Sequence, residues 1–112
     1  LLASIFKTRL EKEGINVILA KDGAEALKII KSKVPLDLII LDIILPKVSG
    51  FEVLESLRAD SSFAKVPIII VSNLGQETDV QKSESLGASE YFIKAKVSIE
   101  DLVSRVKAFL KI

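Results

Sequence analysis

The sequence contains no cysteine and no histidine. Without cysteine the chain has no disulfide, no thiolate nucleophile and none of the usual zinc clusters. Without histidine there is no imidazole for acid–base catalysis or for binding a metal. Any chemistry of this chain must therefore rest on carboxylates, hydroxyls and lysines.

The chain also has no large excess of positive or negative charge and no long apolar segment. Sixteen Lys and Arg residues against fifteen Asp and Glu residues give a formal charge of +1, so no basic field points to nucleic acid. The longest apolar runs are well short of the roughly 18 residues that suggest a membrane span. No signal-peptide pattern opens the chain. We therefore expect a cytoplasmic domain that binds neither nucleic acid nor a membrane.

Methionine is absent too, even at position 1, and we therefore expect the 112 residues to be a fragment of a longer protein. This length accommodates one domain with a real core and is too short for two. A composition of 49% apolar and 28% charged residues is typical of a globular protein. We expect residues 1–112 to form a single domain.

Short aliphatic runs alternate with segments of helical spacing. The runs predict buried strands at 17–20, 38–41, 68–71 and 91–93. The intervening segments predict helices at 2–10, 22–30, 49–57, 77–86 and 98–110. Three of these ranges start at a capping residue, namely Asp22, Ser49 and Ser98. Strict alternation implies parallel strands joined by right-handed crossovers, with helices on both faces of the sheet. The sequence therefore predicts an α/β layer sandwich.

Three polar residues follow three of the predicted strands, namely Asp42, Ser72 and Lys94. Because parallel strands end on the same edge of a sheet, these side chains are expected to converge there. Taken singly, Asp42 could bond only to the loop after it, Ser72 could serve a turn, and Lys94 could be a solvated surface lysine. Together they favour one site.

The chemistry open to these three side chains is narrow. A carboxylate can act as a nucleophile and form an acyl phosphate. A lysine and a hydroxyl can hold the phosphoryl oxygens by charge and hydrogen bonding. The negative charges brought together require a divalent cation with oxygen ligands, for which Mg²⁺ is expected.

Four segments resemble the response-regulator receiver domain of bacterial two-component signalling, and the resemblance covers essentially the whole chain. They are AKDGAEALKII, LIILDIILPKVSGFEVLESLR, VPIIIVSNL and LGASEYFIKA. The resemblance implies a doubly wound parallel sheet in a flavodoxin-like three-layer α/β/α sandwich, with strand order 2-1-3-4-5. It also implies a phosphoacceptor switch of a phosphorelay, in which a histidine kinase or phosphotransfer protein phosphorylates Asp42.

The resemblance assigns further roles. Asp42 and the main-chain carbonyl of Ile44 would be Mg²⁺ ligands, and Lys94 would pair with the phosphoryl group. Ser72 would move toward that group while Tyr91 turns inward, which would alter a face around Tyr91 that binds an output domain or target protein. Such a domain is not an enzyme beyond its own phosphorylation and dephosphorylation at Asp42. Dephosphorylation is expected to be slow, because the apolar Ile44 and Leu74 cannot orient an attacking water.

The chain departs from the family in two places. The family begins with a strand that ends in an acidic pair holding Mg²⁺, whereas these residues begin at the first helix. We therefore expect the first strand to be missing, Mg²⁺ and phosphate binding to be impaired, and 17–20 to be unpaired or moved beside 38–41. Ala95 stands where the family usually has a cis-proline, so the bond after Lys94 is either trans or a strained cis bond costing about 3 kcal/mol.

Two other functions are open to a chain with this pattern. A pseudo-receiver, or adaptor, would keep the fold and its binding face without being phosphorylated, and an acidic pair upstream of Leu1 would argue against it. An aspartate-nucleophile phosphohydrolase is disfavoured, since such enzymes generally need a second carboxylate two residues after the nucleophile and Ile44 stands there.

Overall fold

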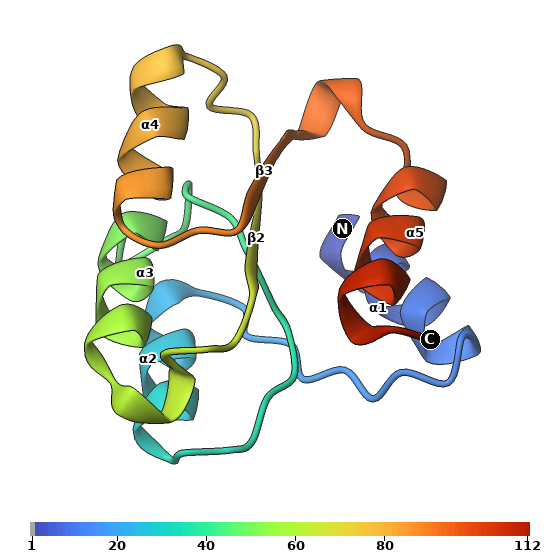
Figure 1. The fold of residues 1–112 in the computed structure, drawn as a ribbon, viewed down its shortest axis with the longest axis horizontal. Helices are drawn as coiled ribbons and strands as arrows, with labels where there is room; N and C mark the ends of the chain where they lie inside the picture. Colours follow the sequence, from blue (N-terminus) through green and yellow to red (C-terminus); the bar gives the residue numbers. More distant parts are fainter. Residues whose placement is uncertain (1) are drawn as a thin grey trace.

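The computed structural model describes residues 2–112 (Figure 1). Helices and strands alternate along the chain, with two short 3₁₀ helices between them. In order, the elements are α1 (Leu2–Lys12), α2 (Gly23–Lys31), β1 (Ile39–Leu41), α3 (Gly50–Ala59), η1 (Ser61–Phe63), β2 (Ile68–Ser72), α4 (Glu77–Ser85), β3 (Glu90–Ile93), η2 (Lys94–Lys96) and α5 (Ile99–Leu110). None of the helices that the structure describes is long and apolar enough to cross a membrane.

The three predicted caps begin the helices as expected. The side chain of Asp22 accepts a hydrogen bond from the Glu25 amide at 2.8 Å, and that of Ser98 accepts one from the Asp101 amide at 3.0 Å. Ser49 accepts from the amide of Phe51 at 3.2 Å. Each cap satisfies an amide that has no partner inside its helix, which defines where the helix starts.

The strands form a parallel sheet in the order β1-β2-β3. Ile39 pairs with Ile68 and Ser72 pairs with Ile93, so the carboxyl ends of the strands lie along one edge. Every residue of β2 is buried, as expected for a central strand covered on both faces.

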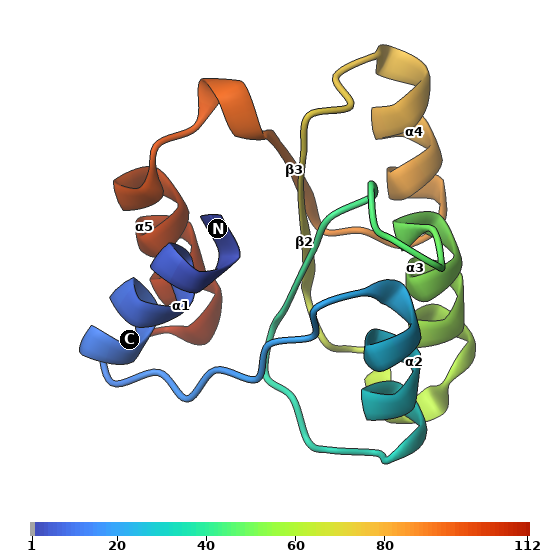
Figure 2. The same cartoon turned by 180° about the vertical axis from the view of Figure 1, so that it is seen from behind.

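Helices cover both faces of the sheet, α2, α3 and α4 on one side and α1 and α5 on the other (Figures 1 and 2). Because side chains alternate along a strand, Ile68 and Ile70 enter one core with α2 and α3, whereas Ile69 and Val71 enter the other with α1 and α5. These two cores confirm the predicted three-layer α/β/α sandwich.

The prediction of a strand at residues 17–20 is wrong. The segment links α1 to α2 without joining the sheet, and Ile18 and Leu19 are exposed. A strand needs a neighbour for its backbone groups. One edge of β1 is taken by β2, and no strand of residues 2–112 lies on its other edge. The segment is therefore unpaired, which is one of the two arrangements expected for it.

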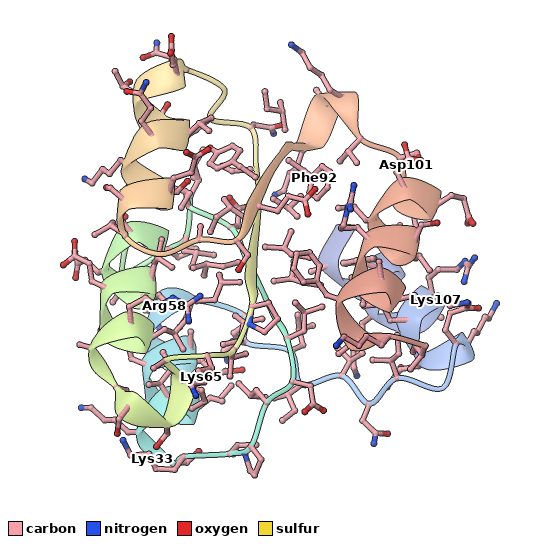
Figure 3. All side chains as sticks on the ribbon, viewed as in Figure 1. Lys33, Arg58, Lys65, Phe92, Asp101 and Lys107 are labelled. Atoms are coloured by element: carbon pink, nitrogen blue, oxygen red, sulfur yellow. The ribbon has the colours of Figure 1, made fainter. Side chains whose placement is uncertain are left out.

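Polar side chains join elements that are distant in the sequence (Figure 3). Arg58 of α3 donates to the carbonyl of Gly87 at 2.8 and 3.0 Å and to that of Phe63 at 2.9 Å. Lys107 of α5 pairs with Glu13 at 2.8 Å, just beyond α1. The first contact holds the turn before β3 against α3, and the second links the two helices on the opposite face.

Candidate phosphoacceptor site

Asp42 and Lys94 meet at the edge where the strands end. One oxygen of Asp42, Oδ2, forms an ion pair with the Lys94 ammonium, although the two residues are 52 positions apart. The other, Oδ1, accepts a hydrogen bond from the amide of Ile44 at 3.0 Å. The side chains of Asp42 and Lys94 are 21% and 30% exposed, so the pair is shielded but accessible. Of the three side chains expected to converge, Asp42 and Lys94 are in contact, and Asp42 also makes the hydrogen bond to its following loop.

Ser72 ends β2 and is fully buried. Its hydroxyl accepts a hydrogen bond from the amide of Leu74 at 3.3 Å, and no hydrogen bond joins it to Asp42 or Lys94 in the described structure. Tyr91 meets the same loop from the other side, because its hydroxyl donates to the carbonyl of Leu74. Burial, the largest influence, raises the pKa of Tyr91, and a hydrogen bond with the Ser72 side chain acts in the opposite direction.

The backbone of Leu74 thus connects two of the predicted residues, and the sequence carried no sign of this role. Every residue but proline has the same amide and carbonyl, so a contact made by the backbone leaves no trace in residue type.

The loop after Asp42 is packed tightly against the start of α3. The amide of Gly50 donates to the carbonyl of Ile43 at 2.9 Å. A Cβ at position 50 would overlap the carbonyl oxygen of Asp42, so only glycine allows α3 to begin this close to the acceptor. Ile43 is buried in the core on the side of α2 and α3, whereas Ile44 is 59% exposed.

Magnesium prefers six oxygen ligands in near-octahedral geometry. Of the residues predicted to bind it, the structure offers the carboxylate of Asp42, whose two oxygens are already engaged, and the carbonyl of Ile44. No group of three Asp, Glu, His or Cys residues in 2–112 is placed to hold a metal ion. Asp42 and the carbonyl of Ile44 thus supply two of the oxygen ligands that a Mg²⁺ site needs.

The peptide bond between Lys94 and Ala95 is trans, as are all peptide bonds in the described structure. Of the two alternatives for this position, the chain adopts the unstrained one. The short helix η2 begins at Lys94, and the lysine side chain still reaches Asp42 from there.

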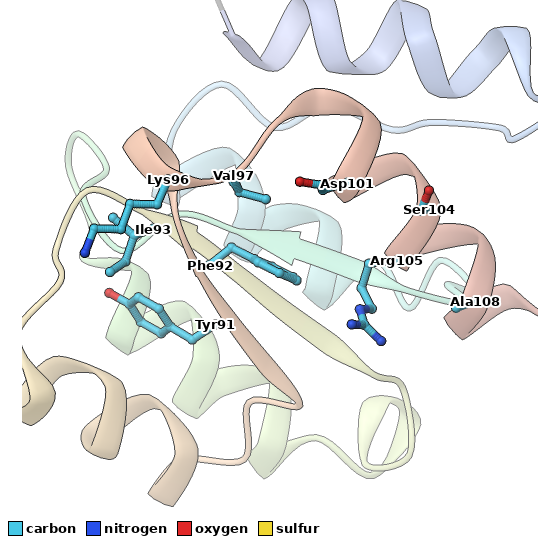
Figure 4. Close-up of a pocket in the computed structure, with 9 residues that line it drawn as sticks. All are labelled: Tyr91, Phe92, Ile93, Lys96, Val97, Asp101, Ser104, Arg105 and Ala108. Carbon is cyan, nitrogen blue, oxygen red and sulfur yellow. The ribbon is translucent and has the colours of Figure 1, made fainter.

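A hollow lies between β3 and α5, beside the site (Figure 4). Tyr91 and Ile93 lie at one end and Arg105 at the other, with Phe92 between them. Its rim carries both signs of charge, and Arg105 pairs with Glu90 at 3.1 Å. Tyr91 therefore touches the loop behind Ser72 and also lines an open surface.

A doubly wound α/β domain with a carboxylate, an ammonium and a hydroxyl at the ends of three parallel strands has the architecture of a two-component receiver. The chain belongs to this family: the model described as "Response regulator receiver domain" matches residues 1–107. The fold and the recognised motifs thus agree on a response-regulator domain of two-component signalling.

Individual relatives agree. The chain is 38% identical over 110 residues to the probable transcriptional regulator ycf27 of Guillardia theta, covering 98% of this chain and 41% of that protein. It therefore spans less than half the length of this curated relative. The Francisella response regulator 1452 receiver domain superposes with a TM-score of 0.86 at 32% identity, over 98% of this chain and 88% of that one. The BeF3-activated N-terminal receiver domain of Klebsiella pneumoniae RstA superposes with a TM-score of 0.85 at 25% identity, over 99% and 91%.

Proposed function

We propose that this domain is a phosphoacceptor switch, in which Asp42 receives a phosphoryl group from a histidine kinase or a phosphotransfer protein. The observation that carries the proposal is the pairing of Asp42 with Lys94 at the ends of β1 and β3. An accessible carboxylate with a cation on one oxygen and an amide on the other is placed for nucleophilic attack and for charge neutralisation.

The transfer follows from these contacts. An oxygen of Asp42 attacks phosphorus, and the bond from phosphorus to the donor's imidazole nitrogen breaks, its electron pair remaining on the nitrogen. Before the transfer, the ammonium of Lys94 is paired with the carboxylate of Asp42. After the transfer, it would pair with the new phosphoryl oxygens, which then carry the negative charge. When Oδ2 is the attacking oxygen, Oδ1 remains as the carbonyl oxygen of the acyl phosphate, and the amide of Ile44 can still donate to it.

The signal would leave the site through the loop that holds Leu74. Ser72 contacts its amide and Tyr91 its carbonyl, so a movement of Ser72 toward the phosphoryl group alters the partner of Tyr91. Tyr91 also lines the hollow beside α5. We propose this face as the docking surface for an output domain or target protein, which the mixed charges of its rim would recognise.

Impaired Mg²⁺ binding is part of the proposal, because the described residues offer one carboxylate and one carbonyl. The test is a titration with Mg²⁺ and beryllofluoride, a mimic of the phosphoryl group, followed by NMR chemical shifts. It compares this chain with a version carrying an added N-terminal strand that ends in two acidic residues. Saturation is expected only for the extended version. Equal affinities of the two proteins would show that an acidic pair is not needed.

Hydrolysis of the phosphorylated Asp42 is expected to be slow. Ile44 is exposed and Leu74 is half-buried, and neither offers a polar group to orient water. Ile44→Gln supplies such a group and should shorten the lifetime of the phosphorylated protein about tenfold, measured in the extended version by loss of radioactive phosphate. Ile18→Gln is the matched control, since Ile18 is exposed to a similar degree and lies in the segment between α1 and α2. A wild-type lifetime of only seconds would contradict the prediction.

The second candidate is a pseudo-receiver, an adaptor that binds partners without being phosphorylated. The engagement of both oxygens of Asp42 favours it, because the carboxylate is satisfied without a metal or a phosphoryl group. Failure of the extended version to bind beryllofluoride would leave this candidate as the better one.

A further inference from the structure

Asp22 is the one charged residue that is buried in the part of the chain whose burial the structure describes; it is 7% exposed. One of its oxygens, Oδ1, caps α2 through the amide of Glu25. The other, Oδ2, lies 3.3 Å from the ammonium of Lys47. Capping needs one oxygen and no charge, since Ser and Asn cap helices as well as Asp does. The second oxygen of Asp22 therefore has a separate task.

Lys47 belongs to the loop between Asp42 and α3, and its backbone is left-handed, with φ of 70°. Residues other than glycine adopt this conformation only with support from their surroundings. The ion pair with Asp22 supplies such support. The amide of Gly23 adds a second attachment by donating to the carbonyl of Pro46 at 3.3 Å. The start of α2 thus holds the middle of the loop by its side chain and by its backbone.

The contact between α2 and this loop is close. A Cβ at Gly23 would overlap the carbonyl of Val48, so glycine is required beside Asp22 for the two segments to approach. The carbonyl of Pro46 also accepts from the amide of Val48 at 2.8 Å, which closes a tight turn at Lys47. Asp22, Gly23 and the turn of residues 46–48 thus form one junction, joined by an ion pair and a backbone hydrogen bond.

The same loop holds the acceptor. The amide of Ile44 donates to Asp42, and Ile44 is two residues from the junction at Pro46. A displacement of residues 46–48 would be transmitted to this amide and so to the Asp42 carboxylate. Misplacement of a reacting group by about 1 Å can cost two orders of magnitude in rate.

We propose that Asp22 is a positioning residue for the phosphorylation of Asp42: through Lys47 it fixes the loop whose Ile44 amide orients the acceptor carboxylate. This inference rests on the proposed function of Asp42. The capping amide of Glu25 and, to a smaller extent, the ammonium of Lys47 lower the pKa of Asp22, which keeps it ionised at neutral pH as the pairing requires.

The chain contains a matched control. Lys33 is also left-handed, with φ of 59°, and pairs with Asp60, which itself caps η1 through the amide of Ser62 at 2.9 Å. This second pair joins the end of α2 to the end of α3, rather than to the loop after Asp42. It therefore has the same chemistry in a position where it cannot orient the acceptor.

The test uses Asp22→Asn, which keeps an oxygen for the cap, and Lys47→Gln, singly and together, with Lys33→Gln as the control. Amide hydrogen exchange at Ile44 and Val48 is measured on this chain. Phosphorylation of Asp42 by acetyl phosphate is measured, at high Mg²⁺ concentration, on the version extended by an N-terminal strand that ends in two acidic residues. We expect about tenfold faster exchange in each variant of the pair. We also expect an about tenfold lower maximal rate, with an unchanged half-saturating concentration of acetyl phosphate.

The double variant should be no worse than either single one, because both remove the same ion pair. Lys33→Gln should change neither measurement. Unchanged exchange at Ile44 and Val48, or additive effects in the double variant, would overturn the proposal. An extended version with the wild-type Asp22 and Lys47 that takes up no phosphoryl group would count against the proposed function instead. Exchange in the chain without the extension would still decide whether Asp22 holds the loop.

Discussion

Asp42→Asn is expected to abolish uptake of the phosphoryl group and the response to beryllofluoride. An amide at this position keeps an oxygen that can accept from the Ile44 amide, so the loop after β1 should retain its conformation. It removes the nucleophilic carboxylate and the negative partner of Lys94. The measurement is the uptake of the phosphoryl group from acetyl phosphate by the extended version, detected as an increase in the mass of the intact protein.

The matched control is Asp37→Asn. Asp37 is an exposed carboxylate just before β1, at the opposite end of the strand from Asp42, and its replacement makes the same change in net charge. Uptake should be unaffected in this variant. Stability should change by no more than about 1 kcal/mol in Asp42→Asn, because a partly exposed ion pair contributes little. Uptake by Asp42→Asn at the wild-type rate would place the acceptor elsewhere and exclude the proposed chemistry.

The elements that could be predicted from the sequence are those defined by local patterns. The run at 68–71 is uniformly aliphatic and became the central strand β2, and Ser98 began α5 as its cap. The run at 17–20 looked equally suited to a strand but did not form one. A strand is completed by its neighbour, and no described residue supplies one there. Aliphatic content alone could not reveal this.

The candidate site likewise has parts that the sequence pattern predicts and parts that depend on tertiary contacts. Asp42 and Lys94 could be placed together because each follows a strand and parallel strands share an edge. The contacts of Ser72 and Tyr91 with Leu74 could not be predicted, since both are made to its backbone. Asp22 could be predicted as a cap, but its pairing with Lys47 depends on a left-handed turn that no residue pattern marks.

Gly50→Ala is expected to destabilise the fold by about 2–4 kcal/mol, the upper part of the range for a buried position that is overfilled. The added Cβ would meet the carbonyl oxygen of Asp42 and the Cα of Ile43. Both are backbone atoms, which cannot move aside as the end of a side chain can. Relief requires α3 to shift away from β1, which would open the core around Val53 and Leu54.

Gly75→Ala is the control for this change. Its Cβ would lie 3.1 Å from Cδ1 of Ile93, the flexible end of a side chain, so a small rotation accommodates it. Urea unfolding followed by circular dichroism should show a much lower midpoint for Gly50→Ala than for Gly75→Ala. Equal midpoints would mean that the loop after Asp42 moves to accommodate the added Cβ at the start of α3. The acceptor would then be held less rigidly than the contacts of Gly50, Ile43 and Asp42 require, and the orientation of its carboxylate would depend mainly on Lys94.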